Sequence, residues 1–114
     1  MDQWSDIVFQ CPFLGGTVHL TSERIAHIRG GHPEFRAMNE QVMKETIRNA
    51  MEKPSIITRS RKDAQGIIFG RWEPSLYGGK YVVVTVISSP ERNWVITAFI
   101  SRYQPKGELL WRQD

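Results

Sequence analysis

Two of the three histidines in this sequence, His27 and His32, lie in one short segment, TSERIAHIRGGHPEF, at residues 21–35. Histidine titrates closest to neutral pH of all side chains, so it often serves as a general acid or base in enzymes. Proline disfavours a helical conformation in the residue before it, and Pro33 follows His32. We therefore expect His32 to be extended, at a junction where its ring can project into a cleft.

His27 lies off the apolar stripe of the same segment, so we expect it to support the site or the helix junction. A separation of five residues does not match the i,i+4 pair of a helical zinc site, even with Glu34 as a third ligand. Cys11 is the only cysteine, which excludes an intrachain disulfide and a cysteine-based zinc site within one chain. No metal or other cofactor is expected.

The second half of the chain supplies cations and aromatic rings. The net charge of +3 and the isoelectric point near 9.3 permit binding to nucleic acid without requiring it. Arginine presents a planar fork to phosphate, and aromatic rings stack on unpaired bases, although charge on hairpins often serves only solubility. The residues of interest are Arg59, Arg61, Lys62, Arg71, Lys80, Arg102 and Lys106, with Trp72, Tyr77, Tyr81 and Tyr103.

This inventory suits one kind of chemistry. RNA cleavage without a metal needs a base for the 2′-hydroxyl, an acid for the leaving oxygen, and cations or donors for the developing charge. The chain offers histidine, arginine, lysine, threonine and tyrosine for these roles. It shows no cluster of acidic residues of the kind that two-metal nucleases use.

Two helices are predicted in the first half of the chain. The first begins at an N-cap, Thr21, and ends at Gly30 and Gly31, which we expect to supply a left-handed residue. The second spans 39–53, where apolar residues recur on one helical face before Pro54 stops the helix. Residues 17–20 alternate and suit a short strand.

Strands are predicted over residues 55–59, 66–72, 80–88, 94–103 and 108–111. Pairing Val84 with Ala98 gives the second hairpin an aliphatic face and an opposite, open face. The aliphatic face carries Val82, Val84, Val86, Ile96, Ala98 and Ile100, and the open face carries Tyr81, Thr85, Thr97 and Ser101, among Val83, Phe99 and Tyr103.

Together these elements predict a single α+β domain over residues 1–114. Residues 1–16 form an N-terminal arm or edge strand, 17–54 the helical part and 55–111 an antiparallel sheet. The N-terminal helices pack on one face of a twisted, mostly antiparallel sheet of four to five strands. The longest apolar run, 81–87, is too short for a membrane span, and residues 1–11 lack a secretory signal, so we expect a cytoplasmic protein.

The order of several short motifs resembles a known group of proteins. VHLTSERIAHIRGGHPEF is followed by EKPSIITRS, KYVVVTV, VITAFISR and GELLW, over about residues 18–111. This order resembles the barnase–EndoU–colicin–RelE-like (BECR-fold) nucleases, small prokaryotic and phage domains of toxin type. Relatives tend to have a charged residue before the H-P-E, where this chain has Gly30 and Gly31.

The resemblance implies a metal-independent endoribonuclease that leaves 2′,3′-cyclic phosphate ends, with RNA as substrate and with a cognate inhibitor or immunity protein as a partner. It assigns catalytic positions to His27, His32 and Thr97. Basic positions fall on Arg59, Arg71 or Lys80. We expect catalysis by His32, His27, Thr97 and Arg71, and substrate binding by Arg59, Lys80, Tyr81 and Arg102. The alternative is a non-catalytic module of the same fold that holds RNA or a protein.

Overall fold

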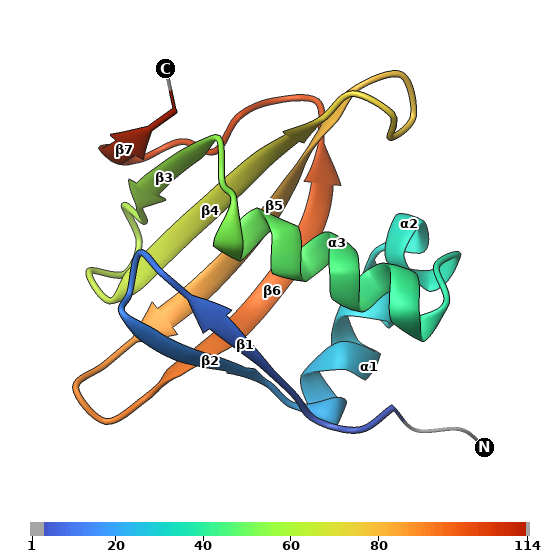
Figure 1. The fold of residues 1–114 in the computed structure, drawn as a ribbon, viewed down its shortest axis with the longest axis horizontal. Helices are drawn as coiled ribbons and strands as arrows, with labels where there is room; N and C mark the ends of the chain where they lie inside the picture. The colour runs from blue at the N-terminus through green and yellow to red at the C-terminus, as the bar shows by residue number, and fades with distance from the viewer. Residues whose placement is uncertain (1–3, 114) are drawn as a thin grey trace.

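The protein is described by a computed structural model over residues 4–113, which form an α+β fold with three helices and one mixed sheet (Figure 1). The strand order across the sheet is β1-β2-β6-β5-β4-β3-β7. The elements are β1 (Ile7–Cys11), β2 (Gly16–Leu20), α1 (Ser22–Gly31), α2 (Pro33–Arg36), α3 (Glu40–Glu52), β3 (Ile56–Arg59), β4 (Gly66–Glu73), β5 (Lys80–Ser88), β6 (Asn93–Ser101) and β7 (Glu108–Arg112).

The sheet has seven strands in the described residues, more than the four to five predicted. The two extra strands come from the N-terminus, where β1 and β2 form an antiparallel hairpin. Ile7, Phe9 and Cys11 alternate with exposed residues and turn into the core. Strand β2 then joins β6 in parallel, with His19 opposite Trp94. Of the alternatives predicted for residues 1–16, an arm or an edge strand, the structure shows the strand, and the short strand predicted at 17–20 is β2, so the helical part begins at Ser22.

Helix α3 lies across the sheet, as Figure 1 shows, and its sequence explains this position. The Asn39 side chain accepts a hydrogen bond from the Val42 N–H at 2.8 Å, which satisfies a free donor of the first turn. One face of the helix is buried, through Met43, Ile47, Ala50 and Met51. The helix predicted over 39–53 is confirmed, and the structure adds Asn39 and Lys53 as its caps.

The central hairpin has the predicted register, with Val84 opposite Ala98. The register then shifts between Thr85 and Val86, so that Val86 pairs with Val95. This bulge gives β6 one extra residue. Val95, with 1 % of its surface exposed, thus takes the core position predicted for Ile96, which is only half-buried.

The face opposite the helices is partly covered by the connection between β6 and β7. A Cβ added to Gly70 of β4 would lie 2.7 Å from Cδ of Pro105. Thr58 of β3 is also buried there, and its hydroxyl donates to the Lys106 carbonyl at 3.1 Å. This face is therefore not open over β3 and β4, whereas on β5 and β6 the paired Thr85 and Thr97 are half-buried. None of the helices described has the length and apolarity that a membrane span requires.

Candidate active site at the edge of strand β6

Helix α1 leads into the site, and it ends differently from the prediction. Its N-cap is Thr21, whose side chain accepts from the Arg24 N–H at 3.2 Å, as expected. The helix then continues through Gly30 and Gly31, and neither glycine has a positive φ. The expectation of a left-handed glycine at this end is wrong. The helix ends at His32, whose extended backbone (φ −133°, ψ 101°) is the one that a following proline favours.

The backbone of His32 is held from both sides. Its N–H donates to the Ile28 carbonyl at 3.0 Å, and its own carbonyl accepts from the N–H groups of Phe35 and Arg36, the start of α2. Phe35 is fully buried and anchors α2 in the core. Arg29 reaches across the junction and donates to the Arg36 carbonyl at 3.2 Å. The short segment between α1 and α2 is therefore fixed in place.

The His32 ring lies against strand β6. It stacks on Phe99, with ring centroids 6.0 Å apart and ring planes 29° from parallel. Side chains alternate along a strand, so Phe99 shares a face of β6 with Thr97. In the described chain β2 pairs with β6 only at Trp94, which leaves this stretch without a strand partner on that side. The structure thus brings His32 to the edge and face of β6 that carry Thr97.

A cavity of about 470 Å³ opens on the other side of the same edge. Its lining combines one carboxylate, two cations and a phenol with apolar walls: Pro33, Glu34, Tyr77, Lys80, Ile100 and Arg102. Phe99 and Ile100 are neighbours on β6, so their side chains point to opposite faces. Residues 32–34 therefore straddle the free edge of β6, with His32 against one face and Pro33 and Glu34 at the other.

The charged groups of this cavity are largely available. Lys80 Nζ donates to the carbonyls of Tyr77 and Gly79, at 2.8 and 3.3 Å, which orients the ammonium group without neutralising it. Within residues 4–113, neither Arg102 nor Glu34 takes part in an ion pair. Lys80 and Arg102 are the two predicted binding residues that the structure brings together.

The turn that carries Tyr77 is strained. Tyr77 has a φ of +48°, and Gly78 and Gly79 follow with +77° and +106°. A left-handed backbone is uncommon for a residue with a side chain, and such strain costs about 1–3 kcal/mol. Trp72 covers the turn so closely that a Cβ on Gly79 would lie 2.6 Å from its ring. The turn presents Tyr77, 57 % exposed, at the cavity.

Tyr77 and Glu34 are the two lining residues with polar side chains that the sequence prediction did not place in the site. The Gly78-Gly79 pair signalled a special turn. The H-P-E motif places Glu34 two residues after His32, which was the signal for a carboxylate beside the histidine. The sequence prediction weighs Glu34 only as a third metal ligand. Among the described residues, no group of three His, Cys, Asp or Glu side chains is arranged to hold a metal ion.

Besides His32 and Thr97, which lie on the other face of β6, four predicted residues lie outside this lining. Arg71 pairs with Val82, so it points to the helix side, where it donates to the Lys53 carbonyl (2.7 Å) and to Glu73 (3.2 Å). Arg59 donates to the Ala64 carbonyl at 2.7 Å and pairs with Glu108 at 3.4 Å. The rings of Tyr81 and Trp72 are in edge contact with centroids 5.0 Å apart, and His27 is exposed on α1.

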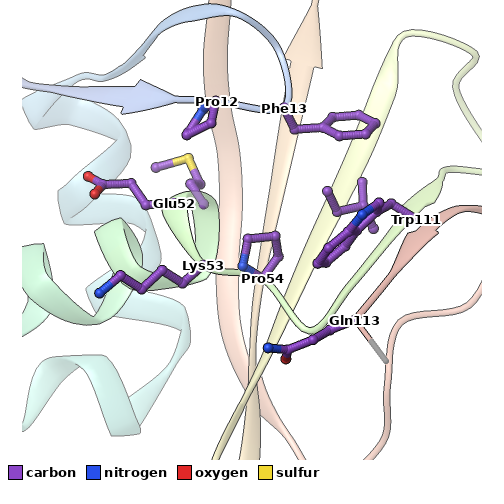
Figure 2. A pocket seen from close by; sticks show the side chains of 9 residues that line it. Pro12, Phe13, Glu52, Lys53, Pro54, Trp111 and Gln113 are labelled. Carbon is purple, nitrogen blue, oxygen red and sulfur yellow. The ribbon is translucent and has the colours of Figure 1, made fainter.

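A separate cavity of about 490 Å³ contains no predicted residue (Figure 2). It lies between the β1–β2 turn, the end of α3 and β7, with Phe13 and Trp111 as aromatic walls. Glu52 on its rim is 3.7 Å from Arg48. The nearby Cys11 thiol donates to the Met51 carbonyl, and burial raises its pKa above the ordinary 9.0. A protonated, buried thiol is a poor nucleophile, so Cys11 is suited to packing rather than to nucleophilic catalysis.

Comparisons with models of protein families, with curated proteins and with solved structures find no match to this chain.

Proposed function

We propose that this protein cleaves RNA without a metal, at a site formed by His32, Glu34, Lys80 and Arg102 on the edge of β6. One observation carries the proposal. A carboxylate and two cations line a single cavity, and an imidazole is held at the same edge of β6, against the other face of the strand. This is the set of groups that transfer of a phosphodiester to its own 2′-hydroxyl requires.

The roles follow from the charges of the groups. The ionised Glu34 accepts the proton of the 2′-hydroxyl, whose oxygen attacks the phosphorus. The bond from phosphorus to the 5′-oxygen breaks, and the leaving oxygen takes its proton from His32 in the imidazolium form. Lys80 and Arg102 stabilise the negative charge on the phosphate. The products are a 2′,3′-cyclic phosphate and a free 5′-hydroxyl.

The surrounding residues position these groups in the proposal. Phe99 holds the His32 ring by stacking, and the Thr97 hydroxyl orients the RNA on that same face of β6, which points away from the cavity that Lys80 and Arg102 line. Arg102 replaces Arg71 as the arginine of the site, because Arg71 is already occupied by Lys53 and Glu73. The resemblance to BECR-fold nucleases supports the same activity. A toxin-type or phage setting, a cytoplasmic location and a cognate inhibitor or immunity protein belong to the proposal on that ground alone.

The test is cleavage of single-stranded RNA in EDTA, with the ends of the products identified. We expect the wild type to leave 2′,3′-cyclic phosphate ends and His32→Ala to lower the rate about 10²- to 10⁴-fold. Glu34→Gln should give a comparable loss. The matched controls are His19→Ala and His27→Ala, which remove exposed histidines elsewhere. A His32→Ala protein that cleaves as fast as wild type would exclude the role assigned to His32.

The second candidate is a module that binds RNA without cleaving it. Large aromatic side chains exposed near the cations favour it: Trp72 (42 %), Tyr77 (57 %) and Tyr103 (68 %). This module would bind RNA with strong salt dependence and no turnover, because phosphate contacts release counterions whether or not a bond breaks. Growth of bacteria during expression of the protein distinguishes the ribonuclease from the non-catalytic binding module. Toxicity that His32→Ala relieves supports the enzyme, and harmless expression supports the module.

A further inference from the structure

A second cavity with a basic lining lies on the sheet face opposite the helices, beside the connection from β6 to β7. Its volume is about 460 Å³. It is bounded by β3, by the loop after β3, by the connection itself and by β7. The lining residues are Ile56, Thr58, Arg61, Tyr103, Gln104, Pro105, Lys106, Gly107, Leu109 and Arg112.

The wall formed by the connection is firmly seated. Pro105 packs on Gly70, and the Thr58 hydroxyl holds the Lys106 carbonyl. Gly107 has a φ of +128°, and a Cβ there would lie 2.2 Å from the Arg59 carbonyl oxygen. Only glycine permits this close approach. The cavity is thus shaped by buried contacts and does not depend on a free loop.

The charges of this cavity are of one sign and unpaired. Arg61, Lys106 and Arg112 line it, and no carboxylate does. Within residues 4–113, the side chains of these three residues have no hydrogen-bond or ion-pair partner. Arg59 on the adjacent strand differs, since Glu108 neutralises it. Three cations without a counter-charge favour a ligand with more than one negative group.

The same lining offers flat apolar surface. Tyr103 is 68 % exposed and Leu109 is 52 % exposed, and both lie at the cavity with Pro105. An exposed tyrosine beside arginines is the combination on which bases stack while their phosphates are bound. A nucleotide meets both requirements, negative charge and a planar ring.

We infer that this cavity binds nucleotides of a single-stranded RNA at a distance from the bond that is cleaved. The inference rests on the proposed function and extends it. Arg102 lines the candidate active site, and the next residue, Tyr103, lines this cavity. A strand that leaves the active site and passes along the connection to the face opposite the helices meets Tyr103, Arg61, Lys106 and Arg112 there. The substrate is accordingly a chain of several nucleotides.

The test is binding of a fluorescent ten-nucleotide RNA to the full chain in the His32→Ala background, at several salt concentrations. We expect Tyr103→Ala to weaken binding about tenfold through lost stacking. Arg61→Ala should lower the slope of log affinity against log salt by about 0.7, the share of one phosphate contact on a single strand. Lys62→Ala is the matched control, because Lys62 is exposed in the same loop and outside the lining.

Affinities of Tyr103→Ala and Arg61→Ala within twofold of the Lys62→Ala control would overturn the inference. So would a poly-glutamate peptide that competes fully with the RNA and binds equally well to Tyr103→Ala, because the ligand would then be an acidic peptide.

A separate assay, with His32 intact, tests the proposed function. Tyr103→Ala should cleave a dinucleotide at the wild-type rate and a ten-nucleotide RNA with about tenfold lower kcat/KM. If no RNA is cleaved, the proposed ribonuclease function is overturned, and the binding measurements alone test whether the cavity binds RNA. Equal loss on both substrates overturns the second site and leaves the enzyme standing.

Discussion

Helices α3 and α1 show two different ways in which this chain fixes a helix. Helix α3 buries four residues and lies across the sheet, whereas α1 buries only Ile25 and Ile28. The end of α3 reaches buried contacts, such as the one from Cys11 to the Met51 carbonyl. The end of α1 has two exposed glycines in helical conformation.

The difference concerns what each helix does. The position of α3 is determined by burial of its apolar face, and most helical stability in proteins comes from such packing. A local restriction determines the end of α1, because Pro33 keeps His32 out of the helix. In the proposed enzyme, α3 stabilises the fold and the weakly packed end of α1 delivers the catalytic histidine.

The largest expected effect is on α3. Ile47 is fully buried beneath the helix, so Ile47→Ala should lower the free energy of unfolding by about 2–5 kcal/mol through lost burial and a cavity. Urea unfolding followed by circular dichroism measures it. Gln41→Ala, on the exposed side of α3, should change stability by less than about 0.5 kcal/mol. A similar small change for Ile47→Ala would contradict the packing role of α3.

A smaller effect, of opposite sign, is expected at the end of α1. A Cβ on Gly30 would meet no atom within 4 Å, and φ there is not positive. Gly30→Ala should therefore raise the free energy of unfolding by about 0.4–1 kcal/mol, by restricting the unfolded chain. The control is Gly79→Ala, which should destabilise because its φ is +106° and Trp72 blocks the Cβ. Destabilisation by Gly30→Ala would show that α1 ends at a left-handed glycine after all.

The smallest expected effect is a pH dependence of stability caused by the Cys11 thiol, which contacts the end of α3. Burial raises the pKa of Cys11 in the folded protein above the ordinary 9.0. As pH rises past 9.0 the unfolded chain loses the thiol proton first, which favours unfolding. The stabilisation that the protonated Cys11 thiol gives the folded state is therefore complete below pH 9.0 and is lost as pH rises through the pKa of the folded state. Between pH 8 and 10.5, stability should fall more steeply for wild type than for Cys11→Ala. Parallel curves would show that the thiol ionises equally easily in both states.

The sequence predicts the elements that depend on neighbours along the chain. The cap Thr21, the extended His32 and the pairing of Val84 with Ala98 all follow from local patterns. The partners of distant segments do not follow from such patterns. The parallel pairing of His19 with Trp94 adds two strands, and the bulge exchanges Ile96 for Val95 in the core.

The same distinction holds for the site. Lys80 and Arg102, both predicted to bind substrate, line one cavity because they lie at the ends of adjacent strands in one hairpin. Arg71 looks equally available in the sequence. Its register opposite Val82 turns it to the helix side, where Lys53 and Glu73 occupy it. Which cations remain free is decided by tertiary contacts, and these carry no local signal.

The parallel pairing of β2 with β6 also bears on how the chain folds. It joins residues 75 positions apart, His19 and Trp94, near the two ends of the sequence. During synthesis the β1–β2 hairpin can form early, but β2 has no strand to pair with on its other side until β6 has been made. Such non-local pairings slow folding and leave strand edges exposed in the meantime. We therefore expect docking of this hairpin onto β6, at Trp94, to be a late step in folding.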